Sequence, residues 1–277
     1  MDKYHSQGGP LNVTDQLITN PLTKAFVRSL QEQGIPYNPD VNGAEQDGVT
    51  FYQVTQRNAR RESAATAYVK PIMKRANFKV ITKAVASKVL IENGRAVAVE
   101  YIRNGNMKET ARAGTEVIVS GGAVCSPKLL LLSGIGPAAV LHDAGVSPVV
   151  DLPGVGENLQ DHLEAYVQYA CTQPVSMAPH LARWRRPWIG LQWLFRQGPG
   201  ASNHFEAGGF LRSNDDVRWP NLMFHFLPVA IRYDGSVPAA GHGYQFHIGP
   251  MFSNLSLIHI SEPTRRTPIS YAVFCLK

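Results

Sequence analysis

The stretch GAVCSPKLLLLSGIG, residues 122–136, decides how the rest of the sequence is interpreted. It joins glycines at both ends to a continuous apolar run, and Ser126 and Pro127 occupy the positions of an N-cap residue and a first-turn proline. The stretch therefore predicts a buried connection in which a strand runs directly into a helix. Its glycines lack the Gly-x-Gly-x-x-Gly spacing that brings backbone N–H groups to a dinucleotide pyrophosphate, and no other part of the 277 residues has it.

The segment before this stretch has the pattern of a β-meander. Short runs rich in β-branched residues predict strands at 78–82, 88–92, 96–102 and 116–121. The pairs Asn93-Gly94 and Asn104-Gly105 stand between the runs, as two-residue hairpin turns require.

Helix and strand signals continue on both sides. Asn20, Pro21 and Gly34 bracket an amphipathic helix over residues 22–33. Beyond a boundary near Gln160, strands are predicted at 164–170, 205–211, 222–227 and 244–249, with one helix over 188–195. The fold class is therefore mixed α/β (α+β).

Composition excludes several classes of protein. With 44% hydrophobic and 17% charged residues the chain is globular, and no apolar run approaches the ~18 residues of a membrane-spanning helix. The start has no basic region followed by an apolar one, so no signal peptide is expected. The net charge is +6, of which +2 belongs to residues 255–277, so the remaining scattered charge argues against a nucleic-acid partner.

Two smaller features bear on location. The basic aromatic cluster RWRRPW, residues 183–188, is interpreted first as a solvated loop between domains and second as a contact with anionic lipid heads. Cys125 and Cys171 have no spacing typical of a metal site or a disulfide framework, which favours a reducing, cytoplasmic compartment.

The quoted stretch resembles the second signature of the glucose-methanol-choline (GMC) oxidoreductases. Residues that match its fixed positions are Gly122, Ala123, Ser126, Pro127, Leu129, Leu130, Ser133, Gly134, Ile135 and Gly136. The stretch LPGVGENLQDH, residues 152–162, resembles the family segment that follows the signature. Within the family, GVGENLQDHLE, GASNHFEAGGFLRS and WPNLMFHFLPVAI are most similar to the choline-oxidising dehydrogenases. The resemblance covers roughly residues 8–254.

This resemblance implies a flavoprotein that oxidises an alcohol by hydride transfer to FAD. It implies part of an FAD-binding domain at residues 77–160, with parts of an antiparallel-sheet substrate domain at 1–76 and 161–254. Residues that it assigns to the cofactor are Ala86, Ser126, Asn158 and Asp161. The substrate would be choline, and electrons would leave for a membrane carrier or for oxygen, with attachment at the inner membrane as an alternative to a purely cytoplasmic location. No metal is implied.

Three side chains receive substrate roles from the resemblance. Glu164 would be the carboxylate for a quaternary ammonium, Phe205 part of its aromatic wall, and His225 an auxiliary group facing the hydroxyl. The residues alone leave other interpretations open: a solvated edge carboxylate, a buried ring and a hydrogen-bonded core histidine. Asp161 and His162 are adjacent, which favours a structural corner beside the flavin over a catalytic pair.

The last residues differ in character. Residues 255–277 back-translate into the two ends of a transposase-based sequencing adapter, which predicts translated adapter DNA rather than a native amphipathic end or strand. The chain is thus expected to be an internal fragment of a larger enzyme, without the family's nucleotide fingerprint and principal catalytic histidine, and by itself to bind no FAD and oxidise no choline. The rival functions are another GMC-family dehydrogenase acting on a neutral alcohol and a non-catalytic quaternary-amine binding module.

Overall fold

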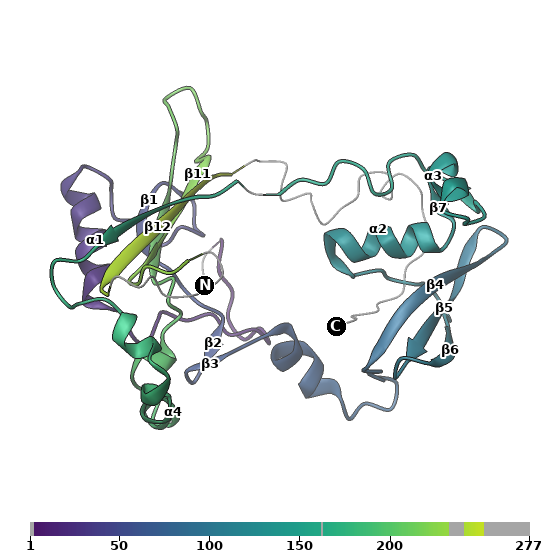
Figure 1. Ribbon diagram of the computed structural model, residues 1–277, viewed down its shortest axis with the longest axis horizontal. Helices are drawn as coiled ribbons and strands as arrows, with labels where there is room; N and C mark the ends of the chain where they lie inside the picture. The colour runs from purple at the N-terminus through teal and green to yellow at the C-terminus, as the bar shows by residue number, and fades with distance from the viewer. Residues whose placement is uncertain (1–2, 162, 233–240, 252–277) are drawn as a thin grey trace. The chain divides into compact units, whose positions relative to one another are not determined.

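The computed structural model describes residues 3–161, 163–232 and 241–251, which form two compact units (Figure 1). Unit 1 takes the described residues up to Phe78 and those from 163 to 251, and unit 2 takes Lys79–Asp161. The assignment of unit 1 to the substrate and of unit 2 to the flavin remains a prediction. His162 and the tail, residues 255–277, lie outside the described residues.

Unit 1 is built on a five-stranded antiparallel sheet of order β1-β10-β11-β12-β9. The strands are β1 (Gly48–Phe51), β9 (Ala165–Ala170), β10 (Ala207–Leu211), β11 (Leu222–Leu227) and β12 (Gly243–Pro250). The four strands predicted after residue 160 are therefore confirmed. The order places β9 at one edge and brings residues near position 50 against β10, more than 150 residues later.

One face of this sheet is covered by α1 (Pro21–Glu32). Asn20 caps the helix by accepting a hydrogen bond from Leu22 N at 2.8 Å, and Pro21 is its first residue, as predicted. Phe26 projects onto the sheet and stacks on Phe226, with ring centroids 4.3 Å apart. Val27 is buried beside it, and these contacts form the core of unit 1.

A buried carboxylate fixes the start of α1 to the sheet. Glu206, which is 1% exposed, precedes β10. Its oxygens accept hydrogen bonds from Asn20 N at 2.6 Å, Thr23 Oγ1 at 2.7 Å and Ser202 Oγ at 2.6 Å. These donors, together with the partial positive charge at a helix N-terminus, replace the water that the carboxylate loses on burial.

Unit 2 contains the meander, with strands displaced from their predicted places. They are β4 (Ala84–Glu92), β5 (Arg95–Arg103) and β6 (Met107–Arg112), in the order β4-β5-β6. The Asn93-Gly94 turn is confirmed, because Glu92 pairs with Arg95. The second turn contains three residues rather than two, because Arg103 pairs with Met107.

Two predicted strands of unit 2 are wrong. Residues 78–82 contain no strand, and residues 116–121 contain no more than an isolated bridge residue, Val119. Val117 is 3% exposed and packs in the core with Val89 and Val99. The β-branched pattern thus marks burial correctly, but a strand also needs a neighbour to receive its hydrogen bonds.

The helix after this segment, α2 (Gly122–Leu132), starts earlier than predicted. Ser126 is not its N-cap, because Gly121 occupies that position and Pro127 lies inside the helix. The left-handed backbone of Gly122, with φ +82°, lets the chain turn into the helix before the serine. Ser126 Oγ still satisfies one terminal donor, since it accepts from Gly121 N at 2.9 Å.

The end of α2 explains the later signature residues. Ser133 is fully buried; its hydroxyl accepts from Val89 N at 2.8 Å and donates to Leu129 O at 2.6 Å. Gly134 follows with φ +81°, and a Cβ there would lie 2.6 Å from Ser147 O. The motif therefore joins the helix to the meander and tightens the turn that follows.

The remaining elements are short. They are β2 (Gln56–Arg57), β3 (Arg60–Arg61), β7 (Ile135–Gly136), β8 (Val150–Asp151), α3 (Ala138–Asp143), α4 (Arg186–Leu194), a π-helical turn η1 (Ala65–Val69), and 3-10 turns η2 (Lys70–Ile72), η3 (Ala178–Leu181), η4 (Arg183–Arg185) and η5 (Pro199–Ala201). The helix predicted over residues 188–195 is confirmed as α4.

The basic aromatic cluster at residues 183–188 is not a loop between domains. It forms η4 and the first turn of α4, inside unit 1. Pro187, with its φ already suited to a helix, favours this start. Trp184 and Trp188 remain exposed, so the contact with anionic lipid heads stays a prediction.

Candidate functional site

The candidate site lies on the sheet face opposite α1. Along β11, Phe224 and Phe226 are buried, and the alternation of a strand turns His225 to the other face. On β12 the same parity applies to His247, which pairs directly across the strands with His225. Two imidazoles therefore lie side by side, outside the apolar core.

An open pocket of about 460 Å³ lies over these histidines. It is lined by Tyr52, Gln53, Glu164, Asn203, Phe205, His225 and His247, and every one of these residues belongs to unit 1. The structure thus brings together all three residues that were predicted to bind substrate. Among the described residues no lysine or arginine lines the pocket, so its surroundings suit a cation.

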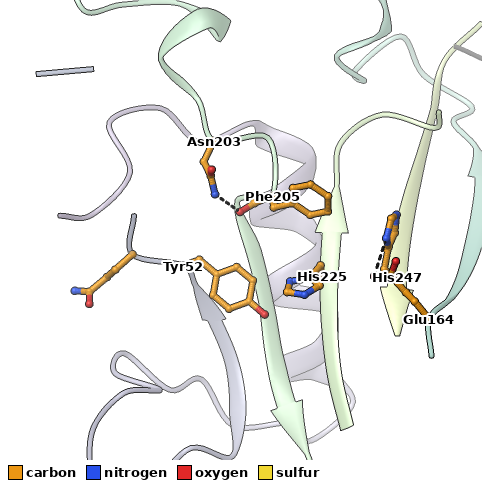
Figure 2. Close-up of a pocket in the computed structure, with 7 residues that line it drawn as sticks. Tyr52, Glu164, Asn203, Phe205, His225 and His247 are labelled. Atoms are coloured by element: carbon orange, nitrogen blue, oxygen red, sulfur yellow. Dashed lines mark hydrogen bonds and ion pairs between the residues drawn. The ribbon is translucent and has the colours of Figure 1, made fainter. Parts of the chain in front are cut away.

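Aromatic rings form two sides of the pocket (Figure 2). Phe205 is 38% exposed and meets the rings of His225 and His247 edge-on, with centroids 5.8 and 5.7 Å apart. The interpretation of Phe205 as a simply buried ring is therefore wrong. Tyr52 lies on the other side of His225, with centroids 5.5 Å apart, and its hydroxyl donates to Phe224 O at 2.8 Å. Burial raises the pKa of Tyr52, which keeps the phenol protonated.

The lack of a side chain at Gly208 leaves room for Tyr52. Gly208 of β10 pairs with His225, and a Cβ on Gly208 would overlap both the Tyr52 hydroxyl and the Phe224 carbonyl. The ring can lie flat on the sheet only because no side chain stands beneath it.

Glu164 is held by His247. The Oε1 atom of Glu164 lies 3.0 Å from His247 Nδ1, and the two side chains are 43% and 13% exposed. Glu164 immediately precedes the edge strand β9, which agrees with its predicted position at a strand start. It is half-exposed but oriented, so it is not a freely solvated edge carboxylate.

The hydrogen bonds behind His247 determine its tautomer. Gln245 is buried, and its Oε1 accepts from Gln168 Nε2 at 2.7 Å and from Ile231 N at 2.9 Å. Its Nε2 atom is therefore the donor toward His247 Nε2, 2.6 Å away. An imidazole that accepts at Nε2 carries its proton on Nδ1 and donates it to Glu164. This arrangement leaves His247 neutral, so the negative charge of Glu164 remains available to a ligand.

His225 is suited to accepting a proton. Burial lowers its pKa, and the nearby charge of Glu164 opposes this shift; only a second proton on His247 would lower the pKa of His225 further. No hydrogen bond holds its ring among the described residues, which argues against a hydrogen-bonded core histidine. A neutral imidazole facing a pocket can accept a proton from a hydroxyl group.

The residues assigned to a flavin lie in unit 2. Ala86 is on β4, an edge strand of the three-stranded sheet, where it pairs with Tyr101 of β5. Ser126 Oγ already accepts from Gly121 N, and Asn158, at φ 55°, accepts from Gln160 Nε2 at 3.0 Å. Asp161 is exposed and is the last described residue of the unit. The assignment of Ala86 to the adenine end of FAD stays a prediction, whereas Ser126 is engaged in starting α2.

Four pocket residues were missed from the sequence: Tyr52, Gln53, Asn203 and His247. His247 had a detectable signal, because YQFHIG shows the same alternation as LMFHF. Tyr52, Gln53 and Asn203 had none, since their places depend on long-range pairing.

Other site types receive no support. The described residues contain no cluster of histidine, cysteine or carboxylate side chains suited to a metal, and Cys125 and Cys171 are free thiols. Within those same residues no helix is long and apolar enough to span a membrane.

Comparison with known proteins agrees with the observed fold. The sequence profile of the GMC oxidoreductases matches residues 1–164. Oxygen-dependent choline dehydrogenase from Staphylococcus xylosus is 51% identical over 254 residues, which are 91% of this chain and 45% of that protein. The enzyme of the same name from Staphylococcus aureus strain JH9 is 50% identical, over 91% of this chain and 44% of its own. The chain thus spans about half the length of the curated relatives that it matches.

Solved structures show the same fold. Pyridoxine 4-oxidase from Mesorbium loti superposes with a TM-score of 0.73 at 27% identity, over 89% of this chain and 45% of that one. A formate oxidase superposes with a TM-score of 0.78 at 20% identity, over 94% and 55% of the two chains. The second similarity concerns the fold alone.

Proposed function

The chain belongs to the GMC oxidoreductase family, and from that premise we propose that the whole protein uses FAD to oxidise choline to betaine aldehyde. The supporting observation is the pocket in which the Glu164 carboxylate stands beside the aromatic rings of Phe205 and Tyr52. Relatives about 50% identical are choline dehydrogenases described as oxygen-dependent, which supports oxygen as the electron acceptor.

The pocket chemistry favours a quaternary ammonium over other cations. A trimethylammonium group has no N–H to donate, so it gains little from acceptors placed for hydrogen bonds. It is attracted instead by ring faces and by a nearby negative charge. Phe205, Tyr52 and Glu164 supply both attractions, and His247 fixes the carboxylate without neutralising it.

The proposed role of His225 is to hold the substrate hydroxyl. The cation at Glu164 would leave the two-carbon arm of choline extending across the same sheet face toward His225, which pairs with His247 on the next strand. Neutral His225 would accept a hydrogen bond from the hydroxyl and assist its deprotonation. Bound FAD would supply the acceptor for the hydride, and the proposed role of Ala86 is to contact its adenine.

A comparison of choline with 3,3-dimethylbutan-1-ol, its uncharged isostere, tests the substrate. In the whole protein loaded with FAD, we expect kcat/KM for choline to exceed that for the isostere by at least about fivefold, because only choline interacts with Glu164. Equal values would favour the rival function, a dehydrogenase of neutral alcohols. Choline binding without flavin reduction would favour the second rival, a non-catalytic amine-binding module.

A further inference from the structure

A second pocket on unit 1 has the opposite charge from the first. Its volume is about 470 Å³, and it is lined by Arg57, Asn58, Arg60, Arg61, Glu62, Thr66, Trp193, Leu194 and Arg196. It shares no lining residue with the pocket at Glu164. Of the described residues that line this cavity, four are arginines and one is a carboxylate, Glu62.

The backbone brings these arginines together from two parts of the chain. Arg57 pairs with Arg60 across the hairpin of β2 and β3, whose two turn residues, Asn58 and Ala59, are left-handed, at φ 54° and 60°. Trp193 of α4 donates its indole N–H to Ala59 O at 2.8 Å, which ties the end of α4 to the tip of the hairpin.

Where the structure describes the chain, only one of the four guanidinium charges is neutralised. Arg57 donates to Glu62 at 2.9 and 3.2 Å, and Glu62 also accepts from Asn12 N at 2.8 Å. Arg60 stacks on the Trp193 ring at 5.1 Å. Within the part of the chain that the structure describes, the guanidinium groups of Arg61 and Arg196 have no hydrogen-bond or ion-pair partner.

We propose that this pocket binds a phosphate group. Three arginines without a carboxylate partner among the described residues line the cavity, two from the hairpin and Arg196 from just after α4, and together they match a ligand with about two negative charges and several acceptor oxygens. A single carboxylate has one charge and two oxygens in a plane, which one or two guanidinium groups satisfy. The phosphate could belong to a soluble ester or to a lipid headgroup.

The proposal is tested by titrating the full 277-residue chain with inorganic phosphate and measuring the heat of binding by calorimetry. Each titration is run at constant ionic strength, sodium chloride is the control titrant, and the series is repeated at higher salt. We expect saturable one-to-one binding that weakens as salt is added. A response that does not saturate, or that chloride reproduces, would overturn the proposal.

The double variant Arg61→Gln/Arg196→Gln identifies the site. It should weaken phosphate binding at least tenfold, because it removes the two unpaired guanidinium groups. The matched control is Arg218→Gln, since Arg218 also stacks on a tryptophan, Trp219 at 4.9 Å, but lies outside the pocket. The control should change the affinity less than twofold, and an equal loss in both variants would refute the assignment.

A measurement on the unmodified chain covers the case in which the double variant does not fold. Phenylglyoxal modifies exposed arginines, and peptide mass spectrometry locates the adducts. Phosphate should slow the modification of Arg61 and Arg196 severalfold and leave Arg218 unchanged; uniform rates would contradict the proposal. Vesicles of phosphatidic acid in phosphatidylcholine distinguish the two sources of the phosphate. If the protein sediments with the vesicles and pyrophosphate releases it, the ligand is a lipid phosphate. If the protein binds phosphate saturably but does not sediment with the vesicles, the ligand is a soluble ester.

Discussion

Substitution of Glu164 by glutamine should weaken choline recognition and leave a neutral alcohol unaffected. Glutamine keeps an oxygen that can accept from His247 Nδ1, 3.0 Å away from Oε1 in the unmodified protein, so the geometry should persist while the charge is lost. The change therefore isolates the electrostatic part of the proposed interaction.

The size of the effect follows from the exposure of the carboxylate. Two unit charges about 5 Å apart attract by about 3 kcal/mol at an effective dielectric constant near 20. Glu164 is 43% exposed, so solvent screening reduces this to about 1–2 kcal/mol, or roughly 5–30-fold in affinity.

The assay compares KM for choline and for 3,3-dimethylbutan-1-ol in the whole protein, with and without the substitution. The substitution should raise KM for choline roughly 5–30-fold and KM for the isostere less than about twofold. Glu45→Gln is the matched control, because Glu45 is an exposed carboxylate of unit 1 outside the pocket. An equal loss for both substrates, or no loss for choline, would refute the role of Glu164 as the ammonium partner.

Two further predictions concern stability. Gly134→Ala should lower the free energy of unfolding by about 2–4 kcal/mol, because it combines left-handed backbone strain with a close contact to Ser147 O. Gly145→Ala is the control, since Gly145 is also left-handed but has open space around it, and it should lower the free energy of unfolding by about 1 kcal/mol. Urea denaturation measures both values, and equal costs would contradict the packing argument. Burial lowers the pKa of His225 below its unfolded value of 6.5, so folding favours the neutral ring. The free energy of unfolding should therefore fall as the pH drops below about 6.5. Denaturation curves between about pH 5 and 8 measure this dependence, and His225→Gln should remove the part that His225 causes. An identical pH dependence in the variant would show that other groups cause it.

Local structure was largely determined by sequence. Asn20 and Pro21 define the start of α1, and Asn93-Gly94 defines one hairpin, because each acts on backbone only a few residues away. Local sequence signals gave the wrong element boundary where an adjacent residue allows a different backbone path. Ser126 is an apt N-cap residue, yet Gly121 and Gly122 allow the helix to begin before it.

Residue types and alternation in the sequence also indicated what the candidate site would contain. An isolated histidine in the run LMFHFL and a carboxylate before a strand are visible in the sequence, and the family resemblance gave both a role. The sequence could not show that His225 and His247 are cross-strand partners, because a strand's alternation fixes which residues share a face but not which strand lies beside it.

Only the tertiary structure decided the chemistry of the two pockets. Glu164 keeps a usable charge because buried Gln245 makes His247 an acceptor at Nε2, and that network depends on the pairing of β9 with β12. The arginines of residues 57–61 are joined by Arg196 because Trp193 ties α4 to their hairpin. In both cases groups far apart in the chain are placed within a few ångströms, and hydrogen bonds and charge, which act over such distances, determine what each side chain can do.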